Sequence, residues 1–195
     1  MIAYARPAMP RIGVISDTHG LVRPEALRAL AGADLIVHAG DVGAPEVLDA
    51  LRAVAPVVAV RGNNDRGRWA RALAETEVVE RGGRSLYVLH DLHELDLDPR
   101  AAGFDAVIAG HSHQPRVERR DGVLYLNPGS AGPRRFRLPI SVGFLSIRGS
   151  DVRAGLMELC VNPPEPCARP PTGAGARSSR PSRPKGVASA RAPRR

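Results

Sequence analysis

Short apolar runs, each followed closely by a polar side chain, recur along the chain at residues 12–15, 35–37, 57–60, 86–89 and 106–109. Their length and their content of Val, Ile and Leu are typical of buried strands. Two helical patterns separate the first three runs. Pro24–Ala31 has proline in its first turn and is followed by glycine, and Pro45–Val54 repeats apolar residues on one face. Residues 11–62 are therefore expected to form a βαβαβ unit with parallel strands, whose carboxyl ends hold ligand sites.

The second half of the chain has a different pattern, in which pairs of apolar segments flank short turn sequences. The turns are Gly82-Gly83, Asp121-Gly122 and Gly149-Ser150, and each predicts a β-hairpin. A parallel half joined to a hairpin-rich half predicts two sheets packed face to face with helices outside. One domain of about 150 residues is sufficient for such a fold.

Composition divides the 195 residues into three parts. Residues 1–10 are an N-terminal extension, residues 11–160 form the domain, and residues 161–195 are rich in Pro, Gly, Ala, Ser and Arg, as is typical of a disordered tail. The tail holds seven Arg and one Lys against Glu165, so it carries most of the formal net charge of +8. It is either a solubilising extension or a non-specific arm for nucleic acid or anionic surfaces; the lack of interleaved aromatic residues favours the first interpretation.

Other features of the composition bear on location. Two cysteines, Cys160 and Cys167, are too few for a disulfide framework. No apolar run approaches the roughly 18 residues that span a bilayer, and the first ten residues do not resemble a signal peptide. We therefore expect a cytoplasmic protein without a membrane partner.

Seven oxygen and nitrogen donors follow the five apolar runs. They are two carboxylates, four imidazoles and one amide: Asp17, His19, Asp41, Asn63, His90, His111 and His113. This mixture suits Mn, Fe, Zn or Ni better than Ca or Mg. Seven donors are too many for one ion and suit two. A pair of ions roughly 3.5–4 Å apart stabilises in-line displacement at phosphorus, so phosphoester hydrolysis is the expected reaction.

The ordered motifs resemble those of the calcineurin-like metallophosphoesterases. They are Asp17-x-His19, Gly40-Asp41, Gly62-Asn63-x-Asp65, His90 and Gly110-His111-x-His113, and the later Asn127-Pro128-Gly129-Ser130 resembles the small bacterial and archaeal phosphodiesterase branch. The resemblance implies a four-layer α/β/β/α sandwich with two mixed β-sheets flanked by helices. It also implies a small phosphoester as substrate and two divalent ions, with Mn preferred and Ni, Fe or Zn as alternatives.

The resemblance further divides the donors between the two ions. Asp17, His19, Asp41 and His113 would hold the first ion, and Asp41, Asn63, His90 and His111 the second, with Asp41 bridging. A metal-bound hydroxide would attack phosphorus, and Asp41, Asn63 and His111 are the expected catalytic residues.

Several residues near these motifs allow more than one interpretation. Asn64 stands where many superfamily members carry a histidine that protonates the leaving group, and an amide has no such proton to give. Asp91 either orients His90 or stabilises a turn, and a turn is also the simpler role for Asp65. Arg66 either contacts phosphate or is an ordinary surface residue. His38 is expected in the core and His93 at the surface.

Two other function classes remain open at this stage. A retromer scaffolding subunit shares the implied fold, so a non-catalytic binding platform is one alternative. A nuclease recruited to nucleic acid through the basic tail is the other. The sequence does not decide between a monomer and a homo-oligomer.

Overall fold

The computed structural model describes residues 10–161. The predicted extension, apart from Pro10, and the predicted tail from Asn162 onward lie outside the described residues. Within the described part, the chain forms ten strands, two α-helices and two short 3₁₀ helices. Neither α-helix exceeds eight residues, and no helix in this part is long and apolar enough to cross a membrane.

The first sheet contains the predicted βαβαβ unit. Strands β1 (Arg11–Ile15), β2 (Leu35–His38) and β3 (Val57–Ala59) are parallel, and α1 (Pro24–Leu30) and α2 (Pro45–Arg52) connect them. The hairpin of β9 (Ser141–Arg148) and β10 (Asp151–Glu158) extends this sheet on the antiparallel side of β1, which gives the order β10-β9-β1-β2-β3. The third predicted hairpin therefore belongs to the same sheet as the parallel unit.

The second sheet is also mixed. Its order is β4-β5-β6-β8-β7, formed by β4 (Thr76–Arg81), β5 (Arg84–Leu89), β6 (Ala106–Ile108), β8 (Val123–Asn127) and β7 (Arg116–Arg120). The two predicted hairpins supply its antiparallel edges, while β5, β6 and β8 are parallel in its centre. The predicted pair of mixed sheets is confirmed.

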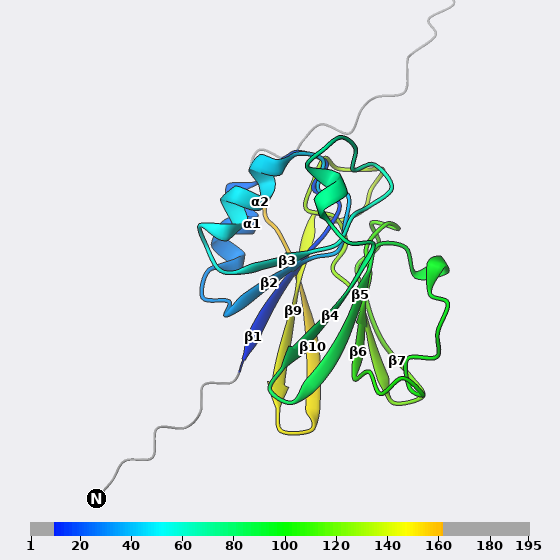
Figure 1. The fold of residues 1–195 in the computed structure, drawn as a ribbon. Helices are drawn as coiled ribbons and strands as arrows, with labels where there is room; N and C mark the ends of the chain where they lie inside the picture. Colours follow the sequence, from blue (N-terminus) through cyan, green and yellow to red (C-terminus); the bar gives the residue numbers. More distant parts are fainter. Residues whose placement is uncertain (1–9, 162–195) are drawn as a thin grey trace, which may run out of the picture.

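Apolar side chains form three layers around these sheets. Ile12, Val14, Leu86 and Ile108 belong to the layer between the two sheets. The helices α1 and α2 cover the outer face of the first sheet (Figure 1). The outer face of the second sheet packs against Leu92, Leu95, Leu97 and Phe104, from a segment that contains η2 (Leu92–Glu94). Leu92 and Leu95 are three residues apart around η2, but Leu97 breaks this spacing and Pro99 follows, so no α-helix forms in this layer.

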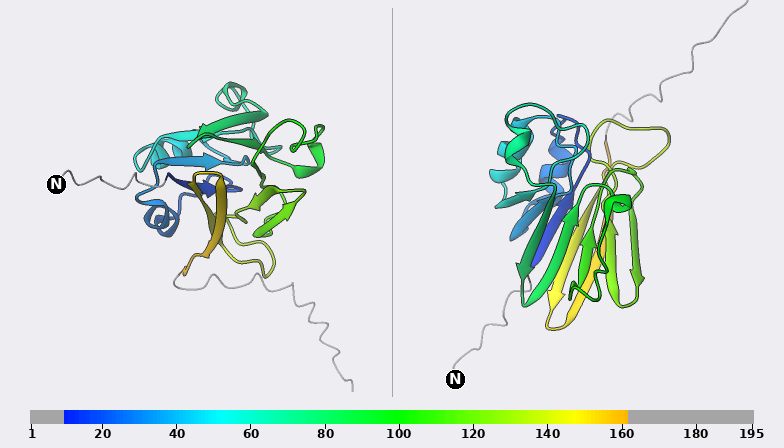
Figure 2. Two further views of the ribbon diagram at one scale, coloured as in Figure 1. Left: turned by 90° about the horizontal axis from the view of Figure 1, so that it is seen from below. Right: turned by 45° about the vertical axis from the view of Figure 1, so that its right-hand side comes forward.

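The direction of the strands positions the loops that matter for function. β1, β2 and β3 of the first sheet and β5 and β6 of the second all end at the upper side of the molecule in Figure 1. Figure 2 shows the two sheets as adjacent layers, with the loops gathered at one end. The carboxyl ends of five parallel strands from two sheets therefore face one common region.

Candidate metal centre

All seven predicted donors lie in the loops that follow these five strands. Asp17 and His19 follow β1, Asp41 follows β2, Asn63 follows β3, His90 follows β5, and His111 and His113 follow β6. A chain of contacts of 3.9 Å or less connects them into two adjacent groups.

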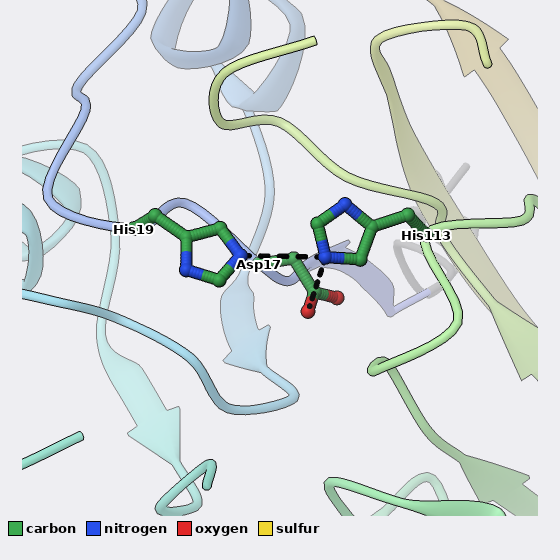
Figure 3. Close-up of side chains that lie close together, drawn as sticks. All are labelled: Asp17, His19 and His113. Atoms are coloured by element: carbon green, nitrogen blue, oxygen red, sulfur yellow. Dashed lines mark hydrogen bonds and ion pairs between the residues drawn. The ribbon is translucent and has the colours of Figure 1, made fainter. Parts of the chain in front are cut away.

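The first group is formed by Asp17, His19 and His113 (Figure 3). The Nε2 atoms of the two imidazoles are 3.3 Å apart, and His113 Nε2 lies 3.2 Å from Asp17 Oδ1. The other carboxylate oxygen, Asp17 Oδ2, accepts hydrogen bonds from Ser16 Oγ and the backbone N–H of His111. Those bonds fix the carboxylate and leave Oδ1, which is buried and accepts no hydrogen bond, directed at the two ring nitrogens.

The second group is formed by Asp41, Asn63, His90 and His111. Asn63 Oδ1 lies 3.0 Å from His90 Nε2 and 3.2 Å from His111 Nδ1, and His90 Nε2 lies 3.5 Å from Asp41 Oδ1. His90 Nδ1 is 2.8 Å from the carbonyl oxygen of Ala39. A carbonyl can only accept, so Nδ1 carries the hydrogen and Nε2 is the atom presented to the site.

The two carboxylates lie between the groups. Ligand atoms of Asp17, Asp41 and His90 fall within 4.8 Å of one another, and Asp41 Oδ2 is 3.9 Å from His19 Nε2. Either carboxylate is therefore within reach of both groups. The division of ligands in which Asp41 alone bridges two ions stays a prediction.

The backbone at the donors adopts an uncommon conformation. Asp17, His19, Asp41, His111 and His113 all have positive φ angles, between 48° and 66°. Residues other than glycine rarely occupy this region, and such strain is concentrated at functional sites. Backbone hydrogen bonds of 3.0 Å from Asp17 N to Gly40 O and from His19 N to Asp41 O hold the first two loops together. The surrounding fold thus maintains a donor arrangement that the backbone alone disfavours.

Two motif glycines permit the close approach of these loops. A Cβ on Gly62 would overlap Asp41, and a Cβ on Gly110 would lie 2.8 Å from Asp17 Oδ2. Any side chain at these positions would displace a carboxylate from the site. The Gly-Asn and Gly-His pairs of the sequence therefore have a steric explanation.

The electrostatics of the donors favour cation binding. Burial alone would lower the pKa of His90, but its contacts with Asp41 and Ala39 raise it to about 9. Burial alone would raise the pKa of Asp41, but hydrogen bonds from His90 and Asn64 lower it. When no ion is bound, a proton on His90 Nε2 lies between this nitrogen and the oxygens of Asp41 and Asn63. Carboxylate, imidazole and amide atoms that converge in this way fit divalent cations of the Mn, Fe, Zn and Ni class.

Asn64 and Asp65 both stabilise the donor loops. Asn64 donates from its backbone N–H to Asp41 Oδ1 at 2.7 Å and from its side chain to Asp41 Oδ2 at 2.5 Å. Asp65 is buried and accepts from the backbone N–H groups of Val42, Gly43 and Gly62. The turn role expected for Asp65 is confirmed, whereas the role of Asn64 as an anchor for Asp41 could not be inferred from the motif.

The remaining predicted residues are structural or lie at the surface. Asp91 accepts from the backbone N–H of His93 at the start of η2, and its Oδ2 lies 3.5 Å from His111 Nε2. It therefore forms a turn and faces His111 rather than His90. His38 is buried with its Nε2 2.9 Å from Thr18 Oγ1, and burial lowers its pKa to about 4. His93 is exposed, as expected.

The Asn-Pro-Gly-Ser motif holds two of the donor loops by hydrogen bonds. Asn127 donates to the carbonyl oxygen of Gly110 and to Ser112 Oγ, and Ser130 Oγ donates to the carbonyl oxygen of Asp17. The motif thus connects the loops after β1 and β6.

Arg135 is a site residue that sequence analysis missed. Its Nη2 atom lies 3.4 Å from His19 Nε2, and it is exposed on the loop that precedes β9. Burial lowers the pKa of His19, and the positive charge of Arg135 adds to that shift. Arg66, the arginine considered from sequence, is exposed. Arg135 stands in a run of arginines without motif spacing, so no sequence signal distinguished it.

The two-sheet sandwich and its strand-end donors define a class of metal-binding α/β proteins, and comparison with known proteins identifies the family. The model of the calcineurin-like phosphoesterase superfamily domain matches residues 10–150, and the chain belongs to this superfamily. The chain is similar to a probable metallophosphoesterase of Methanocaldococcus jannaschii, with 40% identity over 61% of this chain and 67% of that protein. It is 37% identical to a probable metallophosphoesterase of Methanothermobacter thermautotrophicus over 75% of this chain and 91% of that protein.

Solved structures show the same fold. An archaeal phosphodiesterase superimposes with a TM-score of 0.63 at 24% identity and covers 75% of this chain and 99% of its own. Vps29 of Entamoeba histolytica, solved in complex with zinc, gives a TM-score of 0.60 at 26% identity and covers 76% of this chain and 98% of its own. The predicted family and fold class are therefore confirmed.

Binding of a divalent ion is expected to release a proton at neutral pH. With a pKa of about 9, His90 is protonated at pH 7 in the metal-free protein, and it must lose that proton to become a ligand. Apparent affinity for Mn²⁺ should therefore rise about tenfold per pH unit between pH 6.5 and 8. Calorimetric titration in buffers of different ionisation enthalpy measures the release directly. A His93→Asn control should behave as wild type, and titration without proton release at pH 7 would contradict the assignment of His90.

Proposed function

We propose that this chain is a metal-dependent phosphodiesterase that hydrolyses a phosphoric diester at the centre formed by its seven donors. The observation that carries the proposal is the convergence of these donors in two adjacent groups at one end of both sheets. Asn63 and His111 are exposed, so the centre is open to substrate. Family membership and the similarity to an archaeal phosphodiesterase support the same reaction class.

The residues have separable roles in this proposal. Asp17, His19, Asp41 and His113 would hold one divalent ion, and Asp41, Asn63, His90 and His111 the other, with Mn²⁺ as the first candidate. Two such ions supply a water nucleophile of lowered pKa and positive charge for the phosphoryl oxygens. Asn64 fixes both oxygens of Asp41, and Ser16 fixes Asp17. These bonds keep the carboxylates in position before substrate arrives.

Arg135 supplies a further charge for the phosphate group. A guanidinium 3.4 Å from a ligand histidine would be repelled by a bound cation, unless an anion lies between them. A phosphoryl oxygen provides that anion and accepts a charge-assisted hydrogen bond. We assign to Arg135 the phosphate contact that sequence analysis considered for Arg66.

The substitution of histidine by Asn64 limits the leaving groups. Its side chain donates to Asp41 and has no titratable proton, so it cannot protonate a departing oxygen. Esters with acidic leaving groups are therefore the better substrates in this proposal. The cytoplasmic location stays a prediction. A non-catalytic platform on the same fold, nucleic-acid binding and a homo-oligomer stay alternatives that the sequence left open.

The proposal is tested with bis-p-nitrophenyl phosphate and p-nitrophenyl phosphate, using metal-stripped protein to which Mn²⁺, Ni²⁺, Zn²⁺ or Mg²⁺ is added singly. Turnover should require a metal and favour the diester. Asn63→Ala and His111→Ala should each lose at least about 100-fold in kcat because each removes a donor. Arg148→Gln changes an exposed arginine at the end of β9, away from the donors, and should keep wild-type activity. A folded wild-type protein that hydrolyses neither ester with any metal would support the binding-platform alternative instead.

Replacement of Arg135 should weaken substrate binding without disturbing the fold. Arg135→Ala removes one charge-assisted hydrogen bond to phosphate, so kcat/KM for the diester should fall by about tenfold or more. Arg137→Ala is the matched control, because it removes an exposed arginine two residues further along the same loop. Steady-state kinetics of both variants decide the point. Equal losses in the two would show that the loop acts only through its general charge.

A further inference from the structure

A groove adjoins the proposed active centre on the outer face of the second sheet. Its volume is about 360 Å³, within the range of small-molecule sites. Its lining includes the metal-ligand candidate His111 and residues of three neighbouring strands. We call it the His111 groove and define it by Asp91, His111, Arg116, Arg120, Tyr125 and Asn127.

The groove begins at the donors. His111 contributes Nδ1 to the second donor group, and its Nε2 faces Asp91 at 3.5 Å. Asn127 binds the carbonyl oxygen of Gly110 and Ser112 Oγ, and it pairs with Arg116 in the sheet. A substituent on a phosphate bound beside His111 therefore has direct access to the groove.

The floor of the groove is apolar and partly aromatic. Val107 and Ala109 of the segment around β6 contribute to its lining together with Tyr125 of β8. The Arg120 guanidinium lies over the Tyr125 ring, with its central carbon 4.7 Å from the ring centroid. The outer plane of this guanidinium can stack on the flat face of an organic ring, because guanidinium planes stack on π systems.

The wall formed by β7 carries an excess of positive charge. Arg116, Glu118 and Arg120 alternate with the other β7 residues and so face the same side of the sheet. Glu118 accepts from both arginines, at 2.6 Å from Arg116 Nη2 and by a shorter contact from Arg120. One carboxylate thus serves two guanidinium groups, and one positive charge on this wall is not neutralised. The row extends about 13 Å along the strand, which is long enough for a nucleotide-sized group.

From these features we infer that the His111 groove is a subsite for the second ester group of the substrate, and that this group is nucleotide-like, with a ring and a further negative charge. The ring lies over the floor near Tyr125, and the distal anion binds Arg116 and Arg120. The inference rests on the proposed phosphodiesterase function and specifies its substrate class. Arg116 and Arg120 act as specificity-determining residues and take no part in bond breaking.

The test compares two chromogenic diesters that differ by one distal charge. They are thymidine 3′-(p-nitrophenyl phosphate) with and without a 5′-phosphate, and bis-p-nitrophenyl phosphate serves as the substrate without a nucleoside. Mn²⁺-loaded wild-type protein should prefer the 5′-phosphorylated ester by about tenfold in kcat/KM, as expected for charge-assisted contacts. The Arg116→Gln/Arg120→Gln double variant should lose this preference, so that its kcat/KM values for the two thymidine esters agree within about twofold.

Arg148→Gln is the matched control, since Arg148 is an exposed arginine at the end of β9 and outside the groove lining. It should retain the full preference. Equal kcat/KM for the two esters in wild type, or a preference that survives in the double variant, would overturn the inference.

A binding measurement separates this inference from the proposed function. Calorimetric titration of the Mn²⁺-loaded protein should show that thymidine 3′,5′-bisphosphate binds at least about fivefold more tightly than thymidine 3′-phosphate, and that the double variant loses the difference. If no ester is hydrolysed but this difference is found, the catalytic proposal fails and the groove is still an anion subsite. If hydrolysis occurs and the difference is missing, the groove assignment fails alone.

Discussion

The convergence of electron-rich atoms from five loops is the constraint on which the rest of the structure depends. Oxygens of Asp17, Asp41 and Asn63 and ring nitrogens of four histidines are directed at one another across a few ångströms. Contacts with Asp41 and Ala39 raise the pKa of His90 to about 9, so a proton on this imidazole offsets part of the repulsion when no cation is bound. The fold resists their separation through backbone bonds between the loops, through Ser16 and Asn64, and through glycines that leave no room for a side chain. The stability of the fold thus maintains a binding geometry that is unfavourable by itself.

The sequence determined the types of donors, their order and their place at strand ends, because short apolar runs and polar ends are local features. It also indicated two mixed sheets, although the hairpin of β9 and β10 was not assigned to the sheet of β1. A hairpin carries no local signal for the sheet it joins. Contacts between residues far apart in the chain could not be predicted from local patterns either. The bonds from Asn64 to Asp41 span 23 residues, and Arg135 meets His19 across 116 residues.

The two sheets contribute different properties to the centre. The loops after strands of the first sheet, whose outer face the helices cover, supply Asp17, His19, Asp41 and Asn63. The loops after strands of the second sheet, whose outer face the segment around η2 covers, supply His90, His111 and His113. Because the segment over the second sheet contains only the short η2 helix, β7 and β8 keep an accessible face beside His111. The segment that completes the apolar layer on the second sheet therefore leaves the groove beside His111 open for a substituent of the substrate.

The most direct test of the central claim is the anomalous diffraction of a crystal grown with Mn²⁺ and measured near the manganese absorption edge. We expect two peaks, one contacted by Asp17, His19 and His113 and the other by Asn63, His90 and His111, with Asp41 in contact with both. A single peak, or peaks elsewhere on the molecule, would contradict the account of a two-ion centre built from these seven residues.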